Sequence, residues 1–131
     1  MVSRRETGQA AVELALLMPI LLLILLGCLD LGRAFSVWLA LANGAREGAR
    51  YGCLYPTDQA GIVAAAREDL EAEGLAGDAV GVQVVITPGA PSGSPIAVTT
   101  SYTFPLTSSY LLGTPNVAIR ARTQMMIVGG S

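Results

Sequence analysis

The stretch "GQAAVELALLMPILLLILLGCLDLGRAF", residues 8–35, decides the fold of this 131-residue chain. Every residue between Glu13 and Asp30 is apolar or small, and no later part of the chain repeats this pattern. A helix needs about 17–25 mostly apolar residues to cross a bilayer. We therefore predict one transmembrane helix over residues 9–34, with Glu13 and Asp30 near the two membrane interfaces, preceded by a short polar leader of residues 1–8.

The composition excludes several classes of protein. Hydrophobic residues make up 52% of the chain, which is high for a soluble protein and low for a bundle of membrane helices. The net charge is −2, and the eight basic residues form no run, so nucleic-acid binding has no electrostatic support. Arg4 and Arg5 precede the apolar stretch, which places the N-terminus in the cytoplasm and residues after about 35 outside.

The sequence indicates neither a metal site nor an enzyme. Cys28 and Cys53 would stand about 37 Å apart on a continuous helix, far beyond the ~7 Å between Cα atoms that a disulfide allows. The chain has no histidine, which makes a zinc or iron site with these two thiols untenable. We find no catalytic constellation, and we expect no cofactor and no small-molecule substrate.

The helix is predicted to continue past the membrane to about Tyr51, with a kink at Pro19. From Gly32 onward every fourth residue is small. Glycine within a helix costs up to about 1 kcal/mol relative to alanine, so this row suggests a packing surface for another helix or a sheet. The alternative is a glycine-rich composition with the helix ending near Asn43. The candidate packing residues are Gly32, Ala40, Gly44, Gly48 and Gly52.

The C-terminal part is predicted to hold a second helix and three strands. In the segment 57–73, Thr57 is a plausible N-cap, one helix face is apolar, and Gly74 or Gly77 would end the helix. Alternating apolar residues over 80–86, 96–104 and 117–127, separated by loops, favour an antiparallel meander with one covered face. The fold class is therefore α+β: a long N-terminal transmembrane helix, a short second helix and a three-stranded antiparallel sheet.

Five charged residues after the apolar stretch are candidates for interactions. Asp30 and Arg33 are three residues apart and either pair weakly at the outer interface or act as independent charges at the headgroups. Arg46, Glu47 and Arg50 either contact the strands or a neighbouring helix, or form a solvated helix face.

The residues around this stretch resemble those of the TadE-like family, pseudopilins of Tad or Flp pilus systems. The resemblance covers about residues 7–55 and rests on Gly8, Gln9, Glu13, "DLGRAF" and "LANGAREGARYG". It implies a pilin-like protein that a prepilin peptidase cuts between Gly8 and Gln9. Residues 35–131 would then form the extracytoplasmic domain, including the end of the long helix.

Glu13 has two interpretations. A carboxylate near the apolar layer is costly when ionised, unless it pairs or stays at the headgroups. After cleavage, the new ammonium group of Gln9 in one subunit could meet Glu13 of a neighbour and set the register of assembly. Alternatively, Glu13 is a first-turn residue that water and the helix dipole satisfy.

The resemblance implies a structural protein of the bacterial inner membrane, with membrane lipid, prepilin peptidase, other Tad pseudopilins or pilins and the pilus assembly platform as partners. It would enter or prime the pilus after processing. One alternative is an uncleaved single-pass anchor whose outer domain binds a partner. A second is a secreted domain cut at the small-x-small pattern Ala40-Leu41-Ala42.

Overall fold

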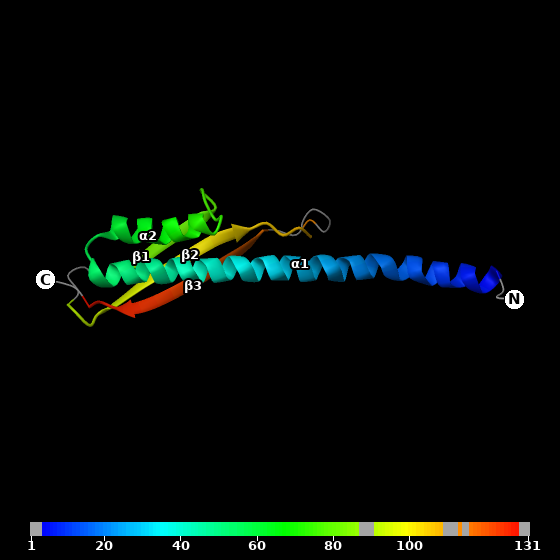
Figure 1. The fold of residues 1–131 in the computed structure, drawn as a ribbon, viewed down its shortest axis with the longest axis horizontal. Helices are drawn as coiled ribbons and strands as arrows, with labels where there is room; N and C mark the ends of the chain where they lie inside the picture. Colours follow the sequence, from blue (N-terminus) through cyan, green and yellow to red (C-terminus); the bar gives the residue numbers. More distant parts are fainter. Residues whose placement is uncertain (1–3, 87–90, 109–112, 114–115, 129–131) are drawn as a thin grey trace.

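The computed structural model describes residues 4–86, 91–108, 113 and 116–128, and it has the predicted α+β fold (Figure 1). The elements, in order, are α1 (Arg4–Leu54), α2 (Gln59–Ala72), β1 (Val80–Val85), β2 (Pro95–Phe104) and β3 (Val117–Met126). The C-terminal half of α1 lies beside α2 and the sheet, while its N-terminal half extends beyond them. We call residues 8–29 the apolar segment, and α1 from Asp30 onward, with α2 and the sheet, the head.

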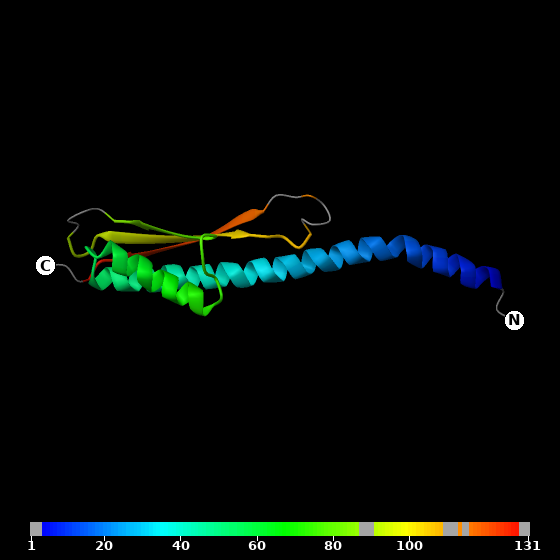
Figure 2. The same cartoon turned by 90° about the horizontal axis from the view of Figure 1, so that it is seen from above.

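Helix α1 is longer than predicted at both ends. It spans 51 residues, or about 75 Å. The prediction of a start near Gln9 was wrong because the preceding Arg4, Arg5 and Glu6 favour helix themselves. Its end lies at Leu54 rather than Tyr51, and Pro56 explains the stop, since a residue before proline avoids the helical conformation. Figure 2 shows α1 bending in its blue part, where Pro19 interrupts the hydrogen-bond ladder.

Helix α2 begins one residue later than the predicted cap implied. Asp58, not Thr57, is the N-cap, and its carboxylate accepts the backbone N–H of Gly61 at 2.9 Å. Its second oxygen accepts the hydroxyl of Tyr51 at 3.0 Å, and this hydrogen bond raises the pKa of Tyr51. Asp58 therefore both caps α2 and links its start to α1, whereas the sequence predicted Thr57 as the cap.

The C-terminal end of α2 is a glycine cap. Gly74 has a φ of 81°, in the left-handed region that glycine accepts without strain. The backbone N–H of Leu75 donates to the carbonyl of Leu70 at 2.9 Å, as in the Schellman motif. Because Leu70 and Leu75 are both buried in one cluster, this cap also returns the chain toward the sheet.

The three strands form the predicted antiparallel meander, in the order β1-β2-β3. The alternation of residues sets the two faces: on β2, Ile96, Val98 and Thr100 are fully buried. Figure 2 shows the sheet on one side of the head and both helices on the other. The covered face of the sheet is thus the apolar one that the sequence predicts.

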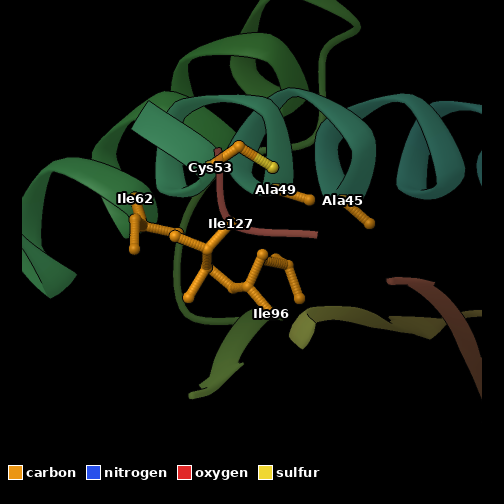
Figure 3. Close-up of a cluster of buried hydrophobic side chains, with 7 residues drawn as sticks. Ala45, Ala49, Cys53, Ile62, Ile96 and Ile127 are labelled. Atoms are coloured by element: carbon orange, nitrogen blue, oxygen red, sulfur yellow. The ribbon is translucent and has the colours of Figure 1, made fainter. Parts of the chain in front are cut away.

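Two clusters of buried side chains join the layers. In the first, Ala45, Ala49 and Cys53 of α1 meet Ile62 of α2 and side chains of the sheet side, including Ile96 and Ile127 (Figure 3). The second contains Ala40, Leu41, Leu70, Leu75, Val80 and Ala121. The buried hydroxyl of Thr100 donates to the carbonyl of Leu41 at 2.7 Å, so this polar group costs nothing in unmet hydrogen bonding.

Candidate functional site

The described part of the chain does not cover the apolar segment of α1. From Gly8 to Leu29 every residue is exposed except Leu26, which is half-buried. Among the described residues, α1 is the one helix that is both long enough and apolar enough to cross a membrane. No residue of its most apolar stretch is buried. An apolar helix surface of this extent does not stay in water. It requires lipid or other protein.

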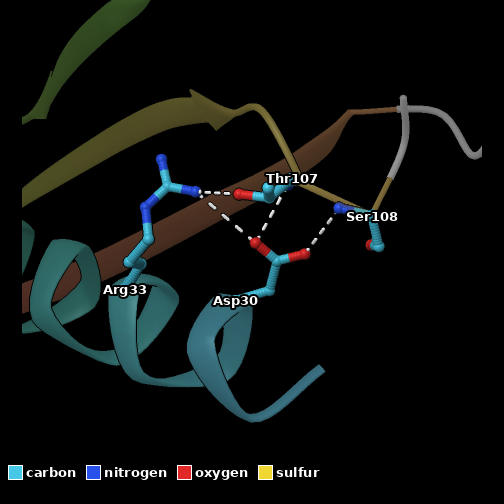
Figure 4. A network of polar contacts seen from close by, with 4 residues as sticks. All are labelled: Asp30, Arg33, Thr107 and Ser108. Carbon is cyan, nitrogen blue, oxygen red and sulfur yellow. Dashed lines mark hydrogen bonds and ion pairs between the residues drawn. The ribbon is translucent and has the colours of Figure 1, made fainter. Parts of the chain in front are cut away.

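Asp30 marks the point where the head begins. It is only 4% exposed, although its neighbours on α1 are largely uncovered. Its two carboxylate oxygens accept the backbone N–H groups of Thr107 and Ser108, each at 2.9 Å (Figure 4). Asp30 therefore fastens the chain that follows β2 to the middle of α1, across 77 residues of sequence.

Arg33 completes this junction. Its guanidinium lies 3.4 Å from the Asp30 carboxylate and donates to the hydroxyl of Thr107. Its Cζ also lies 5.0 Å from the centre of the Phe104 ring, a cation–π distance. Of the two sequence interpretations, the structure shows the pair rather than independent charges. Thr107 and Ser108 were missed because their backbone N–H groups, which carry the contact, leave no trace in residue type.

The small-residue row of α1 divides into two parts. A side chain at Gly44 would place its Cβ 2.7 Å from Cγ of Leu70, and one at Gly48 would place it 3.0 Å from Cβ of Ala66. One at Gly52 would overlap Cδ1 of Ile96. At Gly32 an added Cβ meets nothing within 4 Å. The upper part of the row thus lets α2 and the sheet approach α1 closely, while Gly32 is open in the single chain.

Residues 8–50 match the family model described as TadE-like protein. This match covers about a third of the chain, and we call residues 8–50 the TadE-like domain. The comparisons with curated proteins and with solved structures give no match. The TadE-like domain contains the apolar segment, the junction residues Asp30 and Arg33, and the small-residue row as far as Gly48. Its helix is therefore the part of the chain that the family describes, and the sheet lies outside the matched residues.

At the N-terminal end of the TadE-like domain, three predicted site residues lie within one helical turn and a half. Gly8, Gln9 and Glu13 are all exposed, and the Gly8–Gln9 bond is part of the continuous helix α1. The side-chain amide of Gln9 donates to the Glu13 carboxylate at 3.2 Å. Among the side chains that the structure describes, this neutral amide is the hydrogen-bond partner of Glu13.

The other predicted residues of the TadE-like domain belong to the head. Ala40 does not lie on the surface, because it is buried in the core beside Leu41. Arg50 and Glu47 form an ion pair in which Arg50 Nε lies 2.9 Å from the carboxylate, and this hydrogen bond lowers the pKa of Glu47. Arg46 is exposed. In the described part of the chain no three His, Cys, Asp or Glu side chains gather as metal ligands.

The junction gives a first testable prediction. Asp30→Leu removes both acceptors and leaves the N–H groups of Thr107 and Ser108 without protein partners. Hydrogen bonds to a carboxylate are typically worth about 1.5–3 kcal/mol each, so amide exchange at these two residues should rise on the order of 10- to 100-fold. Hydrogen-exchange mass spectrometry of the full chain in detergent measures this. Asp30→Asn, with one carbonyl acceptor left, should give an intermediate rate.

The exposed Asp78 provides a matched control, because Asp78→Asn removes a carboxylate away from the junction. It should leave exchange at Thr107 and Ser108 unchanged. Wild-type exchange at both residues in Asp30→Leu would show that the carboxylate does not hold this segment.

Proposed function

We propose that the protein is a minor pseudopilin of a Tad or Flp type pilus or secretion system. It is inserted in the bacterial inner membrane by the apolar segment, with its N-terminus in the cytoplasm and its head outside. Prepilin peptidase cuts it after Gly8, and the protein then joins or primes the pilus. It is a substrate of an enzyme rather than an enzyme, and it works with other Tad pilins or pseudopilins and the assembly platform.

One observation carries this proposal: a membrane-length apolar helix that the chain's own head leaves bare, within a TadE-like domain. The segment from Gly8 to Leu29 is about 33 Å long, close to the ~30 Å apolar layer of a bilayer. Asp30 then brings the head to α1 directly above that length. The bare helix can serve as a membrane anchor and later as the surface on which subunits associate.

The residues at the N-terminal end of α1 support both the membrane orientation and the cleavage. Arg4 and Arg5 before the apolar segment support a cytoplasmic N-terminus. Gly8 lies only four residues after the start of α1. Glycine weakens a helix, and helix ends fray, so the Gly8–Gln9 bond lies where α1 opens most readily for a peptidase.

An uncleaved membrane anchor is the second candidate, and the continuity of α1 through Gly8 and Gln9 favours it. The secreted domain is disfavoured, because a cut after Ala42 would remove Leu41, which is fully buried in the head. Mass analysis of the N-terminus in membrane and sheared-fibre fractions distinguishes the two remaining functions. The pseudopilin predicts a mature protein that starts at Gln9, whereas Met1 or Val2 in every fraction would establish the anchor.

Glu13 has the register role in this proposal, since cleavage creates an ammonium group at Gln9 that a neighbouring Glu13 can meet. Glu13→Gln should keep membrane insertion but reduce the amount of protein in sheared fibres. Because the Glu13 side chain is exposed and its described hydrogen bond is to Gln9, away from the head, the head should fold as before. Equal amounts of wild type and Glu13→Gln in fibres would remove this role.

A further inference from the structure

The two sides of the head carry opposite charge. Residues 79–131 contain no Asp or Glu, and their two charged side chains are Arg120 and Arg122. Residues 58–78, which include α2, contain six carboxylates and one arginine, Arg67. Because the sheet and the helices form opposite sides of the head, the sheet side is basic where the α2 side is acidic.

On the sheet side, both arginines lie midway along the edge strand β3, beside polar residues of β2. In the register of β2 and β3, Arg122 lies opposite Thr99 and Arg120 lies opposite Ser101. Gln83 of β1 lies opposite Thr99 on the other side. Both arginines are exposed. Within the described residues the ion pairs are Arg33–Asp30 and Arg50–Glu47, so neither Arg120 nor Arg122 has a carboxylate partner there.

On the opposite side, α2 presents small and acidic residues. Ile62, Ala66 and Leu70 are buried against α1 and the sheet. A helix places the residues about half a turn away on the outer side. These outer residues are exposed, and they are Ala60, Ala64, Glu68 and Glu71. The two alanines allow a flat partner to approach, and the two carboxylates supply charge.

We propose that the outer face of the sheet in one copy binds the outer face of α2 in a second copy. Both faces run along α1 (Figures 1 and 2), so copies whose apolar segments stand parallel in one membrane present these two faces to each other. The contact between subunits is thus assigned to these two faces, and the parallel arrangement of the copies rests on the proposed function. Because the two faces differ, each copy can bind a further one, which gives an open row.

The contact is weak without the membrane. Two strands of ten residues and one of six, spaced about 4.8 Å apart, give a sheet face of roughly 400 Å², below the ~800 Å² per partner of a stable interface. Anchoring both copies in one bilayer raises their effective concentration and makes such a contact sufficient. Since exposed charges carry it, raised ionic strength weakens it.

The test reverses the charges and then restores their complementarity. Full-length chains without the native cysteines (Cys28→Ser, Cys53→Ala) carry either Thr99→Cys or Ala64→Cys, are mixed in liposomes, and react with a short bifunctional maleimide. Arg120→Glu with Arg122→Glu in all copies makes both faces acidic, and Glu68→Arg with Glu71→Arg makes both basic. Each pool alone should lose cross-linked dimer by about fivefold or more.

Mixing the acidic copies with the basic copies should restore the cross-link, because each face then meets its opposite. Thermal unfolding of each variant in detergent verifies that these exposed substitutions leave the head folded. Any of three results overturns the contact. These are no cross-link between positions 99 and 64 in the pool with native charges, a cross-link yield that either charge reversal leaves unchanged, and a yield that does not recover in the mixture. The liposomes contain neither peptidase nor fibre, so those outcomes leave the proposed maturation unaffected, and an unprocessed N-terminus in fibres leaves this contact standing.

Discussion

Gly48→Leu should lower the thermal midpoint of head unfolding by roughly 10–25 °C. A Cβ at this position lies 3.0 Å from the Ala66 Cβ, 3.2 Å from the Ile62 carbonyl oxygen and 3.3 Å from Val98 Cγ1. Two of these three atoms belong to a backbone or to a methyl attached directly to it, so they cannot rotate away. Overpacking of this kind costs about 3 kcal/mol, which corresponds to 4–8 °C per kcal/mol in a domain of this size.

Gly32→Leu is the matched control for this prediction. Gly32 belongs to the same row of small residues, and the substitution adds the same side chain, but a Cβ there meets nothing within 4 Å. Its midpoint should not fall below that of the wild type, because replacing a glycine within a helix removes a helix-weakening residue. Calorimetry of both full-length variants in detergent micelles provides the comparison. Equal midpoints for the two variants would contradict the close packing of α2 on α1 at Gly48.

Gly8→Leu should abolish the mature form of the protein. In the proposed function the peptidase cuts after this glycine, and a bulky residue cannot take its place. The single chain gives no other reason for an effect, because Gly8 is exposed and an added Cβ meets nothing within 4 Å. Intact-mass analysis of the membrane fraction should therefore find only the form that retains the leader.

Gly27→Leu is the control for Gly8→Leu, since Gly27 also lies on α1 with open space around its Cβ. It should be processed like the wild type. The same mature mass in Gly8→Leu and the wild type would show that cleavage after Gly8 is wrong, without any bearing on the fold of the head.

Much of the fold follows from local patterns in the sequence. Alternation over the three strands predicted which side of the sheet is buried, because strands place successive side chains on opposite faces. The i+4 spacing of Ile62, Ala66 and Leu70 likewise predicted the buried side of α2, where all three are fully buried. These features depend on period alone, so they are visible without any knowledge of the partners.

What the sequence did not reveal depends on contacts between distant residues. Asp58 caps α2 in place of Thr57 while Tyr51 from α1 donates to it. Asp30 accepts backbone groups of Thr107 and Ser108, and backbone donors have no residue signature. Several predicted loop residues, 88–90, 109–112 and 114–115, lie outside the described part of the chain, as do leader residues 1–3.

The TadE-like domain accounts for the division within α1. Its part within the head carries small residues where α2 and the sheet need a close approach, while its apolar segment carries large apolar residues that the described part of the chain leaves largely exposed. Leu16 and Ile24, for example, are 70% and 59% exposed. Folding of the head therefore does not require the apolar segment, and burial of that segment must come from lipid or from other subunits.

The accessibility of Cys28 tests this account most directly. In a Cys53→Ala variant it is the single thiol of the chain, it lies within the apolar segment, and it is exposed in the isolated protein. In liposomes a polar maleimide should leave Cys28 unmodified. Two controls should react: Ser101→Cys on the head of a chain that also carries Cys28→Ser and Cys53→Ala, and Cys28 itself once denaturant has dissolved the lipid. Rapid modification of Cys28 in intact liposomes, or a stable lipid-free monomer in buffer, would contradict the account.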